Sequence, residues 1–371
     1  MLLRMKIILF TGVVFLIFAA RMSGQLEYAD EKTKAKCEKY SQTPLPAEAS
    51  AIAHPKVWPE CNSYKLYSGI GVKVDFGEAR KCACLERLAT QAGLEPRFST
   101  ASVFGGSAML TVLYANGEGV PRDLSLALRF ACEAGGAPGE IGGRLHSLEG
   151  LRGTTRVQAK VFDFCDDITS GFMEGFCAAR ASEVRDQDRA HSVKNITSQF
   201  TVGQRAAFDA FRKLEEAYAL AHARGEIDLS GTARAMYQID SEDTLRDDFL
   251  ATLRSFEVGK FPSGSVVLYH DADSRLNSAY RKAITDAEAH KSDYGAVQPE
   301  GIRSAERAWL KYRDAWVAFA RQRYPSVPEE AWLVLLSNDR TSVLDGSFCD
   351  MDAEDSPCAQ HGDTWKPSPL P

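Results

Sequence analysis

The feature that most constrains this chain is the helical spacing of apolar side chains between residues 265 and 344. Leu276 and Tyr280 lie four positions apart, and Trp309 and Trp316 lie seven apart in the next segment. Apolar residues at such spacings share one face of a helix. The segment predicts three helices of roughly 15–24 residues joined by short loops, which is typical of an antiparallel bundle.

The start of the chain predicts export. Arg4 and Lys6 precede an apolar run from Ile7 to Ala20, so residues 1–24 have the pattern of a signal peptide. The run is short for a membrane span, and an uncleaved anchor is the alternative. Export would place the nine cysteines in an oxidising compartment, where disulfides persist. We therefore expect a periplasmic or secreted protein stapled by disulfides.

The length of the chain bounds the number of domains, and its net charge bounds the kind of partner. The 371 residues are enough for two or three domains with their own cores. The net charge of −6 gives no support for a nucleic-acid partner, which would need a basic surface. Residues 25–60 carry several prolines and predict an irregular lead-in with one short helix, whereas residues 349–371 are polar and predict a flexible tail.

A repeat lies within residues 61–150. Two segments align at an offset of 48 residues, and their matching positions are Gly69 with Gly117, Gly71 with Gly119, Asp75 with Asp123, and Ala79 with Ala127. Such a period predicts stacked helical hairpins, each with a glycine turn and an aspartate cap. The pattern resembles the Sel-one-like repeat, a relative of the tetratricopeptide hairpin. The resemblance implies a protein-binding scaffold; the alternative is that the two hairpins only cover a neighbouring domain.

The cysteines suggest several local bridges. Proximity favours a Cys37–Cys61 pair and a pair within the tail, between Cys349 and Cys358. Cys84 and Cys132 occupy equivalent positions of the two hairpins and are candidates for a bridge between them. On that assignment the odd thiol is Cys82.

The polar residues of the C-terminal segment carry a second resemblance. The motifs are Asp273-x-x-Leu276-Asn277-x-x-Tyr280, then residues 305–316 with Trp309 and Tyr312-Arg313-Asp314, then Leu335-Leu336-x-x-x-Arg340. Their order and spacing resembles the lysozyme inhibitor LprI-like family of exported bacterial domains, here over residues 265–348. The chain departs from the family at Trp316-Val317, where a cysteine is usual, which puts transfer of the inhibitory role in doubt.

A degenerate second unit of this kind is expected over residues 160–260. Phe208, Phe211 and Arg212 repeat the spacing of Trp309, Tyr312 and Arg313 at an offset of 101. The resemblance also implies a disulfide between Cys165 and Cys177 at the start of the unit. We expect the glycines between these two cysteines to let the chain turn.

Candidate binding residues are those that match the LprI-like motifs, together with one neighbouring lysine: Asp273, Asn277, Lys311, Tyr312, Arg313 and Arg340. In a structural interpretation, Arg313 and Arg340 pair with Asp273 or Asp314, and Asn277 satisfies a helix end. In a functional interpretation, a basic side chain enters a lysozyme cleft and pairs with its two catalytic carboxylates.

The sequence thus predicts an all-α protein in which helical hairpins precede one or two antiparallel bundles. We expect a non-enzymatic protein that binds another protein. Lysozyme or a related muramidase is the target that the resemblance implies, and another envelope protein held by the hairpins is the alternative. His270, Asp271 and Asp273 have metal-ligand chemistry but lack a second cluster, so we interpret them as a solvated helix start. The other histidines show no nucleophile-base pattern, and no catalytic residue, metal or cofactor is expected.

Overall fold

The computed structural model of the chain describes residues 31–47, 49, 55–94, 99–154 and 161–346. Within these ranges the chain is all-α and has no strand, as predicted. None of the described helices is long and apolar enough to cross a membrane. The predicted signal peptide and the predicted tail, with Cys349 and Cys358, lie outside the described residues.

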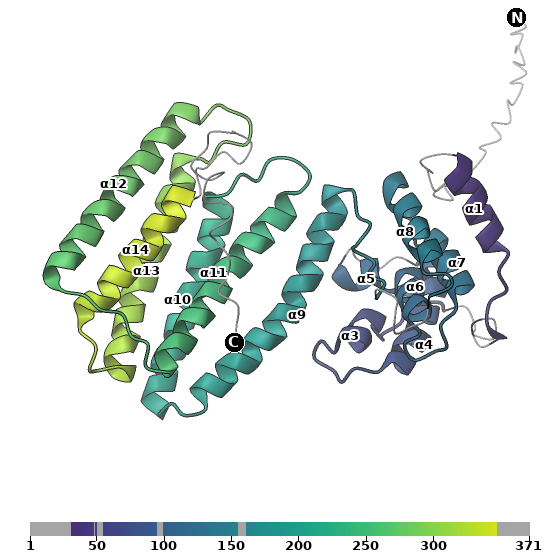
Figure 1. Ribbon diagram of the computed structural model, residues 1–371, viewed down its shortest axis with the longest axis horizontal. Helices are drawn as coiled ribbons and strands as arrows, with labels where there is room; N and C mark the ends of the chain where they lie inside the picture. The colour runs from purple at the N-terminus through teal and green to yellow at the C-terminus, as the bar shows by residue number, and fades with distance from the viewer. Residues whose placement is uncertain (1–30, 48, 50–54, 95–98, 155–160, 347–371) are drawn as a thin grey trace, which may run out of the picture.

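The first lobe is built from short helices (Figure 1). They are α1 (Glu31–Ser41), α3 (Ser63–Ser68), α4 (Phe76–Gln91), α5 (Thr100–Phe104), α6 (Gly106–Asn116), α7 (Leu124–Ala134) and α8 (Pro138–Gly150). Helices α3 and α4 form one hairpin and α6 and α7 form the next, with α4 packed on α6. One buried core fills the lobe, with Leu110, Leu113 and Phe130 almost completely enclosed.

The two hairpins share their turn geometry. Helix α3 ends at Gly69 and α6 ends at Gly117, and both glycines adopt the left-handed conformation. The next helix of each hairpin begins after an aspartate, Asp75 or Asp123, whose carboxylate accepts from backbone amides of the first turn. The amide of each aspartate donates to the preceding helix over 3.0 Å. The same hydrogen bond therefore recurs 48 residues later in the chain, as the matching sequence positions do.

Disulfides tie this lobe together, but two of the predicted pairings are wrong. Cys37 on α1 bonds to Cys132 on α7 instead of Cys61, and Cys61 bonds to Cys82 on α4. The free thiol among the described residues is the buried Cys84, so the prediction that Cys82 is the odd thiol is also wrong. Cys82 and Cys84 are two positions apart on a helix, so they point in different directions. Cys84 and Cys132 cannot meet, because α6 packs between α4 and α7.

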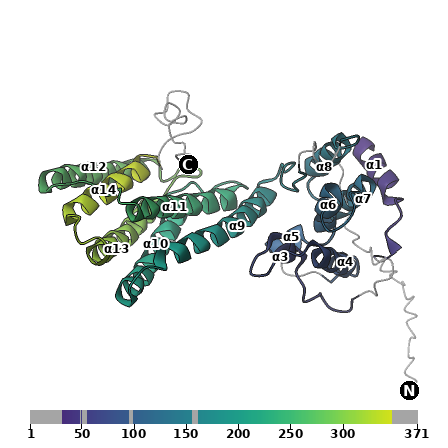
Figure 2. The ribbon, with the colours of Figure 1, turned by 60° about the horizontal axis from the view of Figure 1, so that its bottom comes forward.

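The second lobe consists of six long helices (Figures 1 and 2). They are α9 (Gly171–Thr197), α10 (Val202–Gly225), α11 (Arg234–Glu257), α12 (Val266–His290), α13 (Pro299–Arg323) and α14 (Glu329–Gly346). Each set of three has the same packing order: α9 lies against α11, α12 lies against α14, and the middle helices α10 and α13 pack on each other. A capping box of Thr201 and Gln204 begins α10.

Helix α9 joins the two lobes. Met173, near its start, belongs to the first core, whereas Val193 and Ile196, near its end, pack against the second. Cys177 on α9 bonds to Cys165 in the preceding loop, the pairing that the LprI-like resemblance implies. Three disulfides in the described chain favour an extracytoplasmic protein.

The glycines near the start of α9 do not form the turn that we expected. Gly171 and Gly175 are helical, and they let the start of α11 approach α9 closely. A Cβ on Gly171 would lie 2.4 Å from the backbone of Thr232, and one on Gly175 would lie 2.8 Å from the Cβ of Ala235. Helix α11 begins at Arg234, within this contact.

The middle helices cross at a second pair of glycines. Gly225 ends α10, and Gly301 lies in the first turn of α13. A Cβ on Gly301 would lie 2.2 Å from the carbonyl oxygen of Gly225, so no larger residue fits without moving a backbone. Beyond this crossing, Phe211, Trp309 and Trp316 form an enclosed aromatic core between the two helices.

Candidate functional site

Arg340 lies at the centre of a buried polar cluster, not on a surface. Its side chain on α14 is fully enclosed, and it donates to both carboxylate oxygens of Glu226 over 2.6 and 2.8 Å. It also donates to Glu306 over 2.9 Å and to the Tyr218 hydroxyl over 3.3 Å. The predicted partners, Asp273 and Asp314, are thus wrong for Arg340. Because Glu226 is the residue that caps α10, the cluster ties α14 to the preceding set of helices.

The cluster keeps Glu226 ionised. Burial alone would raise the pKa of this carboxyl, but hydrogen bonds from Arg340 and His222 outweigh burial and hold the pKa below its usual range. The Nδ1 atom of His222 lies 2.8 Å from Glu226. For Glu306, which has Arg340 alone as its hydrogen-bonded cation, burial prevails and the pKa is raised. Because these groups form hydrogen bonds and ion pairs with one another, the cluster holds the helices together and leaves no group for a partner.

Tyr312 also packs against the core of the second lobe. Its ring stacks between Phe211, at 5.7 Å, and Tyr218, at 5.5 Å, and burial raises its pKa well above the usual range. Trp316 packs edge-on against Phe211 at 4.7 Å and is 1% exposed. Trp316 is therefore closed to a partner, whereas Tyr312 is half-buried and its ring is held by these two stacking contacts.

Asp273 and Asn277 form a local pair on the outside of α12. The Asn277 amide donates to the Asp273 carboxylate over 2.9 Å and to its carbonyl oxygen over 2.8 Å. Asn277 is exposed and Asp273 is half-buried, and both lie within one helix, so Asn277 does not satisfy a helix end as predicted.

The outer side of α13 presents a row of exposed residues, which we call the α13 ridge: Arg307, Leu310, Lys311, Asp314, Ala318 and Arg321. Lys311 has no ion-pair partner in the described part of the chain, and the neighbouring Leu310 is 37% exposed. The other cations of the ridge are paired, Arg307 with Glu300 and Arg321 with Glu329. Among the predicted binding residues, Lys311 is therefore the one that is both exposed and unpaired.

Arg313 lies beside the ridge and is only partly accessible. Its guanidinium donates to Asp314 over 2.7 and 3.0 Å and lies over the ring of Trp309, 5.4 Å from its centroid. The predicted Arg313–Asp314 pair is thus present. With 20% of its side chain exposed, Arg313 is a less accessible cation than Lys311.

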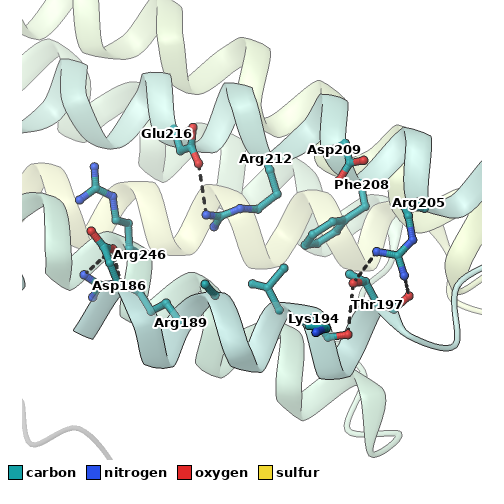
Figure 3. Close-up of a pocket in the computed structure, with 12 residues that line it drawn as sticks. Asp186, Arg189, Lys194, Thr197, Arg205, Phe208, Asp209, Arg212, Glu216 and Arg246 are labelled. Carbon is teal, nitrogen blue, oxygen red and sulfur yellow. Dashed lines mark hydrogen bonds and ion pairs between the residues drawn. The ribbon is translucent and has the colours of Figure 1, made fainter. Parts of the chain in front are cut away.

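A hollow of about 550 Å³ between α9, α10 and α11 was not predicted (Figure 3). Its four arginines are already engaged: Arg205 donates to Thr197, Arg212 to Glu216, Arg189 to Asp186 and Arg246 to Glu242. Lys194 is the lining cation that has no ion pair among the described residues. Behind it, Asp243 accepts from Arg185 and Arg189, which holds α9 against α11. These ion pairs stabilise the packing of the helices, and they leave little free charge for a bound anion.

Comparison with known proteins finds a related family for one part of the chain. Residues 266–347 match the model of the family described as lysozyme inhibitor LprI. No curated protein matches the chain, and no solved structure does. The Sel-one-like resemblance of the hairpins stays a prediction. The segment that spans α12, α13 and α14 is thus similar to a family of lysozyme inhibitors, which is not a family of enzymes.

Proposed function

We propose that this chain is an exported protein whose α12–α14 segment binds lysozyme or a related muramidase and inhibits it. The family match over residues 266–347 carries this proposal. The disulfides fit an oxidising compartment, and export through residues 1–24, to the periplasm or beyond, is part of the proposal.

The α13 ridge is the surface that we propose for the contact. Glycoside hydrolases act through two carboxylates in a cleft, and an unpaired ammonium group is attracted to such a site. Lys311 supplies that group, and Leu310 beside it supplies apolar surface. Arg340 and Tyr312 contribute indirectly, because they fix α13 in place from the core.

The experiment is a titration of lysozymes of several types with the mature protein, in which binding heat and residual cell-wall hydrolysis are both followed. We expect loss of hydrolysis at stoichiometric concentration with at least one lysozyme. Lys311→Glu should abolish the inhibition, whereas Lys213→Glu, on an exposed position of α10, should leave it unchanged. Equal inhibition by both variants would exclude the ridge.

The hairpin lobe favours a second function, as a scaffold that holds another envelope protein. The shared hydrogen bonds of the two hairpins support the proposal that they are Sel-one-like repeats. Val72 and Val74 in the first turn are nearly half exposed and offer apolar contact. A partner cross-linked to this lobe in the envelope should be lost in the Val72→Asp, Val74→Asp variant and retained in Lys311→Glu. The reverse pattern would contradict the scaffold.

A further inference from the structure

A second hollow lies where the hairpin lobe meets α9. It has a volume of about 490 Å³, and apolar or aromatic side chains from α3, α5, α6 and the loop before α9 line most of it. They include Tyr64, Phe104, Met109, Val112, Phe162 and Phe164. This volume and this lining are typical of sites that enclose a small organic ligand.

Covalent and polar contacts hold the walls of this hollow in place. The Cys165–Cys177 disulfide joins the lining loop to α9. Phe104 packs edge-on against Phe164 at 6.3 Å, and the guanidinium of Arg180 lies 4.9 Å from the centre of the Phe104 ring. A ligand would therefore meet a preformed site and would not have to order it, which favours affinity.

The mouth combines exposed apolar residues with two arginines, Arg180 and Arg185, each of which is paired with an aspartate. Val161 is 66% exposed and Val184 is 41% exposed. Arg180 uses only Nη2 to bind Asp163, and Arg185 uses Nε and Nη2 to bind Asp243. The described residues offer no acceptor to the other nitrogens of these two guanidinium groups. Donors therefore remain at the edge of an apolar hollow.

We propose that this hollow binds an alkyl or aryl carboxylate, with the apolar body inside and the carboxylate on Arg180 and Arg185. Charge-assisted hydrogen bonds from a guanidinium group suit a carboxylate. A peptide fits less well, because its amide groups would need partners in the hollow. Besides the charged groups and the tyrosines, Ser68 is the one polar side chain among the lining residues, and the Tyr64 hydroxyl is already buried.

The test is calorimetric titration of the mature full chain with dodecanoate below its micelle concentration. We expect saturable binding of one molecule per chain. Dodecyltrimethylammonium, which has the same tail and the opposite charge, should bind at least about tenfold more weakly. Absence of saturable dodecanoate binding, or equal binding of the cation, would overturn the proposal. So would tighter binding of acetyl-Leu-Leu-Phe with a free carboxyl terminus, which would indicate a peptide site.

Two variants, each with a matched control, test whether the ligand binds in this hollow. Val184→Glu adds a negative charge at an exposed position of the mouth and should weaken dodecanoate binding by about tenfold or more. Val202→Glu, at a 90% exposed position at the start of α10, is the control and should bind normally. Ala181→Phe should fill the hollow and also prevent binding, whereas Ala190→Phe, further along α9, should not. Normal binding by both Val184→Glu and Ala181→Phe would overturn the proposed site.

Discussion

Replacement of Arg340 by leucine tests whether this motif residue acts by packing. The variant would leave the Glu226 carboxylate fully buried without its cation, and Glu306 would lose its hydrogen-bonded partner. Breaking a buried ion pair on one side costs about 3–5 kcal/mol. We expect the free energy of unfolding to fall by that amount in urea denaturation. The fluorescence of Trp309, Trp316 and Trp332 can follow it, because all three lie in the affected core.

A second substitution separates loss of the ion pair from loss of volume. In Arg340→Leu/Glu226→Gln the buried charge is gone, and we expect at least about 2 kcal/mol of stability to return. The loss in Arg340→Leu should also be smaller at pH 5 than at pH 8. Without Arg340, only His222 opposes the effect of burial on Glu226, so we expect the pKa of this carboxyl to rise and stability to fall as the carboxyl ionises. A loss below about 1 kcal/mol, or a double variant as unstable as the single one, would refute this reasoning.

Three further predictions concern stability and thiols. Gly301→Ala should destabilise the chain by several kcal/mol in urea denaturation, because the backbones of α10 and α13 touch there. Gly203→Ala, with open space around it, is the control and should be neutral or slightly stabilising. Equal effects of the two substitutions would contradict the close approach of the two helices at Gly301. Burial raises the pKa of Glu215 to about 7, so the melting temperature should fall as pH rises from about 4.5 through 7. Glu215→Gln should flatten this fall, whereas Glu216→Gln, the control, should not. An unchanged pH dependence of the melting temperature in Glu215→Gln would contradict the raised pKa. Cys84 should react with maleimide only after unfolding, as peptide mass mapping can show, and labelling in the native state would contradict its burial.

Local patterns explain what the sequence could predict. The caps at Asp75 and Asp123 and the apolar spacing around Trp309 act within a few residues, and the helices formed there as expected. The LprI-like motifs were also readable, because they preserve spacing along single helices.

Contacts between distant helices were not readable. Arg340 and Glu226 lie 114 residues apart, and nothing near either residue indicates the other. The bridge from Cys37 reaches across 95 residues to Cys132, past the nearer Cys61. Gly171 looked like a turn residue, although its role is to admit the backbone of α11. Each of these features depends on which elements lie side by side, and that depends on the whole fold.

The proposed contact of the α13 ridge with lysozyme depends on Lys311. The dissociation constant and the residual hydrolytic activity of one inhibited lysozyme, measured with the mature protein and with its Lys311→Glu and Lys213→Glu variants, test this contact most directly. We expect Lys311→Glu to lose both binding and inhibition and Lys213→Glu to keep them. Binding that is unchanged in Lys311→Glu, or absence of binding to every lysozyme tested, would contradict it.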